Sequence, residues 1–361
     1  MIRSSYYQDL TKMNTFGMKV KARCFMEYDS VADLVDIEFE ELARPVLHIG
    51  GGSNLLFTDD FKGTILHSKI NFIEILDQPH GNPSAPQTHE TEESDVLVSV
   101  GAGVIFDDFC DWAAQQNLWG VENLSHIPGE VGASAVQNIG AYGVEVKDII
   151  SKVFCYDTVE EEFVNFDVEE CGYGYRDSIF KNPEIKGRYI VTHVVFRLSR
   201  SPEPKLDYGH LNDAVKAAAG EGVLTPALIR RVIIRIRKEK LPEPSVMGSA
   251  GSFFKNPVIS IEHFERIKAA AEAESGPDCK VPHYLVPDQS AVKIPAAWLI
   301  EQCGWKGKRS GNAAVYDKQP LVLVNYTGEA YPEEIVGLEK RIIESVKKRF
   351  GIELCPEVDH I

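Results

Sequence analysis

Two glycine-rich segments are the residues best suited to bind a ligand through the backbone. The first, Gly50-Gly51-Gly52-Ser53-Asn54, follows the short apolar run 46–49. Residues without a Cβ let backbone N–H groups approach an oxyanion closely, so this turn could hold a phosphate. It carries neither the Walker lysine nor G-x-G-x-x-G spacing, so a plain tight turn explains the pattern equally well.

The second segment, residues 127–143, is long, low in charge and rich in small residues. Such a backbone could pack flat against a large planar ligand. A buried connection whose glycines allow close packing is the alternative. Two such segments in one chain favour a ligand more than either does alone.

An arginine among aromatic rings suggests a clamp for a carboxylate. Arg176 lies in the segment 172–178 together with Tyr173 and Tyr175, and a guanidinium binds a carboxylate through paired N–H donors. The pattern alone favours a solvated surface turn at Arg176-Asp177, because most arginines are exposed.

A hydroxyl could be activated in the segment 248–257. Ser252 is flanked by small residues and followed by Phe253 and Phe254, which could exclude water from it. No Gly-x-Ser-x-Gly elbow is present, and Ser249 and Ser252 could equally be turn hydroxyls that bond to nearby backbone. A Ser-His-Asp hydrolase is therefore a weak interpretation.

One stretch concentrates positive charge directly before this segment: Arg230, Arg231, Arg235, Arg237, Lys238 and Lys240. A solvated helix face is the default interpretation. A site for an anionic small molecule such as a diphosphate competes with it.

Length and charge limit the classes of protein. The 361 residues are enough for two or three domains, and 38 basic against 54 acidic residues give a net charge of -16. This charge disfavours a broad nucleic-acid or anionic-membrane surface. The N-terminus has no signal-peptide core and no run of eighteen apolar residues occurs, so we expect a cytoplasmic protein.

The cysteines indicate a reduced protein. They are odd in number and widely spaced, with no C-x-x-C pair, so neither a disulfide framework nor a zinc site is indicated and we expect no bound metal. We expect all seven to be core residues: Cys24, Cys110, Cys155, Cys171, Cys279, Cys303 and Cys355.

Hydrophobic periodicity predicts the elements that position these residues, in an α+β arrangement. Strands are expected at 46–49, 63–67, 95–100, 151–156 and 189–198. Helices are expected at 106–114, from Thr225-Pro226 to 236, and from Pro332 to a cap at Gly351. The biased stretch 78–94 is expected to be a solvated loop, and Ser201-Pro202-Glu203-Pro204 a domain boundary.

Taken together, the motifs resemble the UDP-N-acetylenolpyruvoylglucosamine reductase (MurB) family over nearly the whole chain, in its type I branch with a tyrosine loop. The marks are Asn14-Thr15-Phe16, the Gly50–Asn54 turn, Ile127-Pro128-Gly129, Gln137–Gly143, Tyr173–Ser178, Gly251–Pro257 and Pro356-Glu357-Val358. So many motifs in the same order are highly specific.

The resemblance implies a fold and a domain order. It implies an FAD-binding domain of the vanillyl-alcohol-oxidase (PCMH) type, made of two α/β subdomains, plus a C-terminal α/β substrate-binding domain. Subdomain 1 would comprise residues 1–70 joined by the tail 352–361, subdomain 2 residues 71–200, and the UDP-sugar domain residues 201–351.

The resemblance also implies site residues, with FAD and NADPH as cofactors. The catalytic positions fall on Arg176, Ser252 and Glu357. The flavin positions are Gly50, Gly51, Gly52, Ser53, Asn54, Ile127, Gly129, Gly132, Ala133, Ser134, Asn138, Gly140 and Gly143. The substrate positions are Tyr175, Tyr208 in the tyrosine loop, Lys240, Asn256, Lys306 and Gln319.

The reaction implied is hydride transfer from NADPH through FAD to the vinyl carbon of an enolpyruvyl ether. Arg176 would stabilise the charge on the substrate carboxylate, Ser252 would supply the proton, and Glu357 would orient the network or carry a proton. We expect small-molecule partners only, with no nucleic acid or membrane, and a monomer. The stretch 78–94 is longer than the usual family loop, and Glu130 and Ala133 stand at variable positions of the flavin segment.

Three other classes compete with this interpretation: a flavin oxidase of the same superfamily, a flavin-free sugar-nucleotide binding module and a serine hydrolase. A colourless protein would favour the last two. A yellow protein that consumes oxygen with an alcohol would favour the oxidase, although no histidine flavin-linkage motif is evident.

Overall fold

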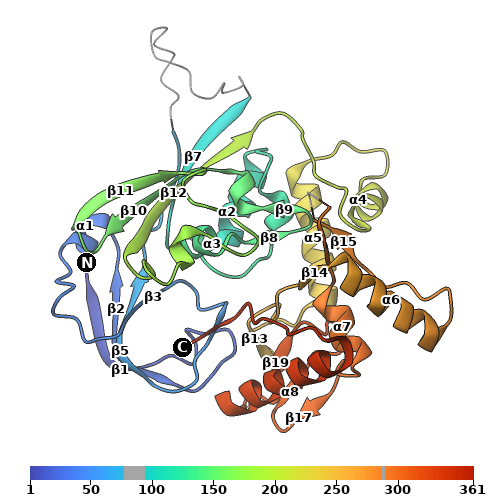
Figure 1. Cartoon of the computed structure of the whole chain (residues 1–361). Coiled ribbons are helices and arrows are strands. Elements are labelled where there is room, and N and C mark those ends of the chain that lie inside the picture. The colour runs from blue at the N-terminus through green and yellow to red at the C-terminus, as the bar shows by residue number, and fades with distance from the viewer. Residues whose placement is uncertain (77–93, 287–288) are drawn as a thin grey trace. The chain divides into compact units, whose positions relative to one another are not determined.

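The computed structural model describes residues 1–76, 94–286 and 289–361. It divides by its internal contacts into two compact units, each made of segments that are separate in the chain (Figure 1). The first unit comprises 1–8, 22–52 and 61–239, and the second comprises 9–21, 53–60 and 240–361. Residues 201–239, which the resemblance assigns to the C-terminal domain, belong by their contacts to the first unit. The expected loop at 78–94 lies outside the described residues apart from its last residue.

A four-stranded sheet in the first unit positions the first glycine-rich turn. Its order is β1 (Arg3–Asp9), β2 (Lys21–Tyr28), β5 (Phe61–Ser68) and β3 (Val46–Ile49), with β2 and β3 both parallel to β5. The short helix α1 (Val31–Val35) follows β2, and its Leu34 packs with Tyr28 and Leu66 in a buried cluster. The strands expected at 46–49 and 63–67 are confirmed as β3 and β5.

A five-stranded antiparallel sheet forms the centre of the first unit. Its order is β11 (Glu162–Asp167), β10 (Ile150–Asp157), β12 (Tyr189–Ser199), β7 (Asp95–Gly101) and β6 (Ile73–Ile75). Helices α2 (Phe106–Gln115) and α3 (Val131–Gln137) pack against it (Figure 1), with the rings of Phe109 and Phe196 4.7 Å apart between centroids. The helix expected at 106–114 and the strands expected at 95–100, 151–156 and 189–198 are confirmed.

The rest of the first unit consists of short elements and two helices. The short elements are η1 (Glu122–Leu124), β8 (Gly140–Ala141), β9 (Val144–Glu145), η2 (Val146–Asp148) and η3 (Ile179–Lys181). Helices α4 (Leu211–Ala219) and α5 (Pro226–Lys240) pack together through Leu211, Val215, Ile229 and Ile233. The expected start of α5 is confirmed, since the Leu228 N–H donates to Thr225 Oγ1 at 3.2 Å.

In its described residues, the second unit contains two small antiparallel sheets and three helices. One sheet is β13 (Gly248–Ser249), β19 (Leu323–Asn325), β18 (Ala313–Val315) and β17 (Arg309–Ser310); the other is β14 (Val258–Ser260), β16 (Ala291–Lys293) and β15 (Tyr284–Leu285). The helices are α6 (Ile261–Ser275), α7 (Ala296–Gln302) and α8 (Pro332–Phe350). As expected, Gly351 caps α8 in the left-handed region, with φ 68°.

The final residues of the chain are tied into the second unit. Strand β20 (Asp359–His360) pairs in parallel with β4 (Leu55–Leu56). The Thr58 N–H and Oγ1 both donate to the Ile361 carbonyl, each at 2.8 Å. The tail is therefore an ordered part of the unit that carries Ser53 and Asn54.

The expectation that all cysteines lie in the core is only partly right. Cys24, Cys110, Cys155 and Cys171 are buried, but Cys279 and Cys303 are half-buried and Cys355 is exposed. All seven are free thiols. The Cys355 carbonyl accepts a hydrogen bond from the Lys255 N–H, while its side chain lies at the surface. Among the described residues, no helix is both long and apolar enough to cross a membrane.

Candidate active site

The two glycine-rich segments meet inside the first unit. Strand β3 ends at Ile49, and a Cβ placed on Gly50 would lie 3.0 Å from the Cβ of Ala133. A Cβ on Gly51 would lie 3.6 Å from the Cα of Gly129. This close approach depends on glycine at position 50, because any larger residue would press on α3. Residues that are about 80 positions apart therefore form one surface rich in backbone.

Helix α3 packs closely against Ala102. A Cβ on Gly132 would come within 2.9 Å of the Ala102 Cβ, so only glycine fits there without a shift. Ser134 is buried, and its Oγ donates to the Val131 carbonyl at 2.7 Å. The Ser134 hydroxyl is thus used within the helix, which favours a structural contribution of its side chain to the expected flavin segment.

Asn138 ends α3 and fixes the loop that carries Arg176. It is fully buried and left-handed (φ 46°), and its Nδ2 donates to the Gly174 carbonyl at 2.7 Å and to Glu145 Oε2 at 3.0 Å. Asparagine tolerates this backbone conformation better than most residues. The expected flavin segment and the Arg176 segment are therefore joined by one side chain.

A two-residue hairpin follows, and Tyr208 lies against it. Strands β8 and β9 are joined by Tyr142 (φ 49°) and Gly143 (φ 81°), the two left-handed positions of a tight hairpin turn. A Cβ on Gly143 would lie 3.5 Å from the Tyr208 Cβ. The rings of Tyr142 and Tyr208 meet edge to face at 6.0 Å, and Tyr208 remains 50% exposed.

The guanidinium of Arg176 lies on this hairpin. Its Nη2 donates to the Gly140 carbonyl at 2.7 Å and its Nη1 to the Asn138 carbonyl at 3.2 Å. The residue is half-buried with φ 55°, and its guanidinium carbon is 5.5 Å from the ring centroid of Tyr175. Arg176 does occupy a tight turn, as the simpler interpretation held, but its charged group is fixed against the expected flavin segment.

Sequence reasoning treated Arg237 only as one of several basic residues, and the structure singles it out. Its Nε donates to the His126 carbonyl at 3.1 Å. Burial lowers the pKa of Arg237, and the positive charge of Arg176 lowers it further, while Tyr142 and Asp107 oppose this. Two guanidinium groups thus interact within the first unit. Helical spacing in the sequence could have singled out Arg237, because position 237 shares a helix face with the apolar Ile233.

The basic stretch therefore divides into the ion-paired Arg230, the half-buried Arg237 and exposed members. Arg230 donates from Nε to Asp111 at 3.1 Å and from Nη2 to Asp107 at 3.1 Å. The carboxylates of Asp107 and Asp111 largely neutralise the positive charge of Arg230. The remaining members, Arg231, Arg235, Lys238 and Lys240, are exposed.

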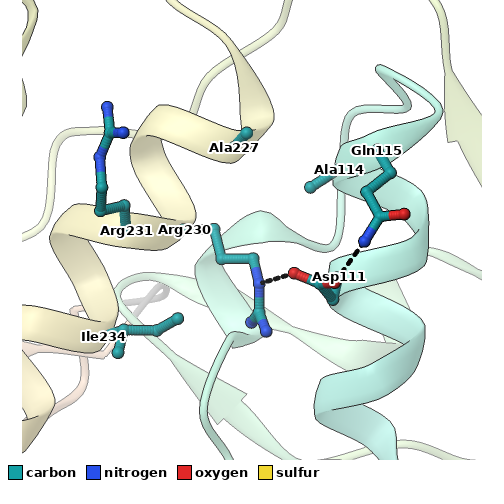
Figure 2. A pocket seen from close by; sticks show the side chains of 7 residues that line it. All are labelled: Asp111, Ala114, Gln115, Ala227, Arg230, Arg231 and Ile234. Atoms are coloured by element: carbon teal, nitrogen blue, oxygen red, sulfur yellow. Dashed lines mark hydrogen bonds and ion pairs between the residues drawn. The ribbon is translucent and has the colours of Figure 1, made fainter.

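A cavity of about 250 Å³ opens between α2 and α5 around this pair (Figure 2). Asp111 accepts from both Arg230 and Gln115 there. Its lining is Asp111, Ala114, Gln115, Ala227, Arg230, Arg231 and Ile234. None of these is an expected flavin or substrate residue, so this cavity is not the candidate active site.

In the second unit, backbone pairing aligns the Ser252 segment with the tail. The Glu357 N–H donates to the Phe253 carbonyl at 2.8 Å, and the Lys255 N–H donates to the Cys355 carbonyl at 3.0 Å. Ser252 is exposed and Glu357 is half-buried. The two expected catalytic residues of this unit therefore stand on adjacent, hydrogen-bonded stretches.

Asn54 ties the first turn to the same tail. Its Nδ2 donates to the Glu357 carbonyl at 3.0 Å, and its own carbonyl accepts from the Asp359 N–H at 3.0 Å. The Asn14-Thr15-Phe16 motif contacts strand β13, which precedes Ser252: the Ser249 N–H donates to the Thr15 carbonyl at 2.9 Å. A Cβ on Gly248 would lie 2.1 Å from the Phe16 oxygen, so the motif requires glycine there.

The expected UDP residues of the second unit have different surroundings. Asn256 accepts the Ala296 N–H on Oδ1 at 2.9 Å, which holds the first turn of α7. Lys306 pairs with Glu301 at 2.8 Å on the surface. The Gln319 carbonyl accepts the Val322 N–H at 3.0 Å. Lys240 is exposed at the last position of α5.

Comparison with known proteins places the chain in a family. Residues 23–159 match the family model "FAD binding domain", and residues 243–361 match "UDP-N-acetylenolpyruvoylglucosamine reductase, C-terminal domain". A UDP-N-acetylenolpyruvoylglucosamine reductase of Bacteroides fragilis is 51% identical over 353 residues, covering 98% of each chain. One of Porphyromonas gingivalis is 44% identical, covering 100% of this chain and 99% of its own.

A solved structure agrees in fold. The crystal structure of UDP-N-acetylenolpyruvylglucosamine reductase (MurB) from Thermus caldophilus has a TM-score of 0.63 and 22% identity, covering 100% of this chain and 98% of its own. The α+β arrangement with an FAD-binding domain, expected from the sequence, is thereby confirmed. With full-length identity of this order, the chain belongs to the UDP-N-acetylenolpyruvoylglucosamine reductase family.

Proposed function

We propose that this protein reduces the enolpyruvyl ether of UDP-N-acetylglucosamine to UDP-N-acetylmuramate, with FAD as cofactor and NADPH as reductant, in the cytoplasm and as a monomer. Full-length similarity to named reductases is the observation that carries the proposal. Bound FAD supplies hydride transfer, a chemistry that no side chain of this protein offers. Small-molecule substrates are its partners in this proposal, in keeping with a net charge of -16.

The residues of the first unit fit FAD. The absence of a Cβ at Gly50 lets its backbone lie against Ala133, where a side chain would press on that residue. Gly51, Gly52, Gly129, Gly132, Gly140 and Gly143 extend this surface of small residues, and Ile127, Ala133, Ser134 and Asn138 are the other proposed flavin residues of this unit. The proposal also includes Ser53 and Asn54, which belong to the second unit. Such a surface suits a large planar ring and a diphosphate held by N–H groups. The proposed flavin subdomains are 1–70 with 352–361, and 71–200.

Arg176 is proposed to hold the substrate carboxylate. Its two bonds to the Asn138 and Gly140 carbonyls fix the plane of the guanidinium before substrate arrives. A fixed cation stabilises negative charge that develops on a carboxylate without having to reorganise. Arg237, whose charge interacts with that of Arg176, adds to the positive potential on this side.

Ser252 is proposed to give the proton to the substrate carbon. A serine hydroxyl is a weak acid, so it needs a strongly basic acceptor and an oriented partner. Glu357 lies on the paired tail strand and is proposed to orient that network or to carry a proton. The UDP part would be held in the proposed domain 201–351 by Tyr208, Lys240, Asn256, Lys306 and Gln319, with Tyr175 contributing from the Arg176 turn.

Replacing Ser252 separates the two half-reactions and tests this assignment. Reduction of the flavin by NADPH needs no proton at the substrate carbon, whereas reoxidation by the enolpyruvyl ether does. In anaerobic stopped-flow, Ser252→Ala should keep near-parental flavin reduction and slow reoxidation by about 10² to 10⁴. Arg176→Ala should slow the same step and also weaken substrate binding.

Ser249→Ala is the matched control, because it removes the other hydroxyl of the segment and should leave both half-reactions unchanged. Reoxidation of Ser252→Ala at the parental rate would refute Ser252 as the donor and make Glu357 acting through water the leading candidate. A purified protein without flavin absorbance would instead refute the proposed function as a whole.

A further inference from the structure

A buried histidine beneath the first glycine-rich turn bridges two carboxylates. His67 is 2% exposed; its Nδ1 lies 3.0 Å from Glu27 Oε1 and its Nε2 lies 2.9 Å from Glu130 Oε1. Glu27 is its direct partner across the β2–β5 pairing, so the first contact is set by strand register. Glu130 comes from the start of α3, 63 residues later in the chain.

This arrangement requires a shared proton. A neutral imidazole has one N–H, and an ionised carboxylate can only accept hydrogen bonds. Both contacts can be hydrogen bonds only if the histidine is an imidazolium or one of the two carboxyl groups is protonated. In either case, the group of three carries one negative charge instead of two. The proton shared through His67 therefore removes half of the negative charge that the half-buried Glu27 and the buried Glu130 would bring.

Glu130 lies directly against the backbone of the turn. A Cβ on Gly50 would lie 3.3 Å from its Oε2, and a Cβ on Gly51 would lie 4.0 Å from its Oε1. Its main chain is the N-cap of α3, where its carbonyl accepts the Ser134 N–H at 2.9 Å. One residue thus contacts both glycine-rich segments: its side chain touches the first and its backbone belongs to the second.

The electrostatic consequence is specific to the proposed ligand. A bare carboxylate beside the N–H groups of the turn would repel an anionic diphosphate and compete for those donors. The other charged or titratable groups facing the cluster lie mainly on the Glu27 side. Lys69 Nζ is 3.9 Å from Glu27 Oε1 and Arg3 Nε is 3.7 Å from Glu27 Oε2, whereas Tyr28 and His48 are neutral groups nearby. His67 is therefore the group that shares a proton with Glu130.

We propose that His67 and Glu130 are positioning residues of the flavin site: Glu130 joins the two glycine-rich segments, and His67 supplies the proton that lets a carboxylate stand beside a diphosphate-binding turn. The proposal rests on the proposed function.

Affinity for FAD, measured by titrating apo-protein and following flavin fluorescence, tests the proposal. His67→Leu leaves Glu130 buried without the group that shares its proton and should raise the Kd for FAD at least about tenfold. Glu130→Gln, which is neutral and of equal size, should raise the Kd less than His67→Leu does, because it leaves no uncompensated buried charge. The double variant His67→Leu/Glu130→Gln should recover most of the loss, because the uncompensated charge is gone.

Two further variants keep the test decisive. His67→Gln, which is polar and uncharged, should also raise the Kd for FAD. It replaces His67→Leu in the test if the leucine variant does not fold. His193→Leu removes another partly buried histidine, stacked on Phe154 in the same unit, and should leave the Kd for FAD unchanged. An unchanged Kd in both His67 variants, or a double variant as weak as His67→Leu, would overturn the charge argument. Failure of the parent to bind FAD would refute the proposed function instead.

Discussion

Asn54 donates a hydrogen bond from Nδ2 to the main-chain carbonyl of Glu357 at 3.0 Å, across 303 residues of chain. The first glycine-rich turn, expected to bind the flavin, therefore ends in a side chain that holds an expected catalytic residue. Because the Glu357 N–H also donates, to the Phe253 carbonyl, both backbone polar groups of Glu357 are hydrogen-bonded. Asn54 couples the position of Glu357 to that of the turn.

Asn54→Ala should impair substrate reduction beyond its effect on stability. Losing one hydrogen bond costs about 0.5–1.5 kcal/mol of unfolding free energy. Released from Asn54, Glu357 should be less well placed, so flavin reoxidation should slow about tenfold or more while flavin reduction changes little. Stopped-flow and thermal unfolding measure the two effects.

Thr58→Ala is the matched control, because Thr58 Oγ1 also binds the tail, at the Ile361 carbonyl. It should lower stability to a similar extent and leave reoxidation near the parental rate. Equal slowing in both variants would show that general loosening of the tail, rather than the Glu357 contact, sets the rate.

Tyr208 should act as a lid over the UDP part of the substrate. Its half-exposed ring packs against the Tyr142-Gly143 turn, and the exposed part can contact a ligand without local unfolding. Tyr208→Ala should raise the KM for the UDP-sugar about tenfold or more and leave flavin reduction by NADPH nearly unchanged. Tyr208→Phe keeps the ring and separates its contribution from that of the hydroxyl. Equal damage to both half-reactions in Tyr208→Ala would contradict the lid.

Lys240 should confer salt dependence on substrate binding. It is exposed at the end of α5, and added salt screens exposed charges. Affinity for the UDP-sugar should fall as salt is added to the parent, and Lys240→Ala should weaken binding and flatten that dependence. Lys238→Ala removes a neighbouring exposed cation and should do neither. An unchanged affinity and slope in Lys240→Ala would mean that this end of the helix is a solvated face.

His48 should make the protein less stable in acid. Its Nε2 lies 2.7 Å from the hydroxyl of the fully buried Tyr28, and burial lowers the pKa of His48 from 6.5 to about 3. Below pH 6.5 the unfolded chain takes up a proton here that the folded chain refuses, so this contribution to stability falls as the pH falls toward 3. At about pH 5 the cost is about 1–2 kcal/mol.

Thermal unfolding between about pH 8 and pH 5 measures this effect. His48→Gln keeps a polar partner for Tyr28 but cannot titrate, so it should lose less stability over this interval than the parent. His210→Gln is the control because its side chain is exposed. If His48→Gln and the parent lose the same stability, the acid sensitivity comes from other groups.

Elements with a strong local pattern could be predicted from the amino-acid sequence. Apolar residues three and four apart predicted α2, α5 and α8, and the Thr225-Pro226 and Gly351 caps marked two of their ends. Short apolar runs between breakers predicted β3, β5, β7, β10 and β12. The motif resemblance identified the family, because motif order is a property of the chain alone. It did not test the residue roles, which remain predictions.

How those residues meet depends on the packing of elements that are distant in the chain. The approach of Gly50 to Ala133, the bonds of Arg176 to the Asn138 and Gly140 carbonyls, and the His67 bridge to Glu130 all join residues far apart in sequence. The same reason explains why Cys355 is exposed although cysteine is usually buried. Periodicity reports which face of an element is apolar, but the partner of a polar side chain depends on how separate elements pack, and no local spacing encodes that.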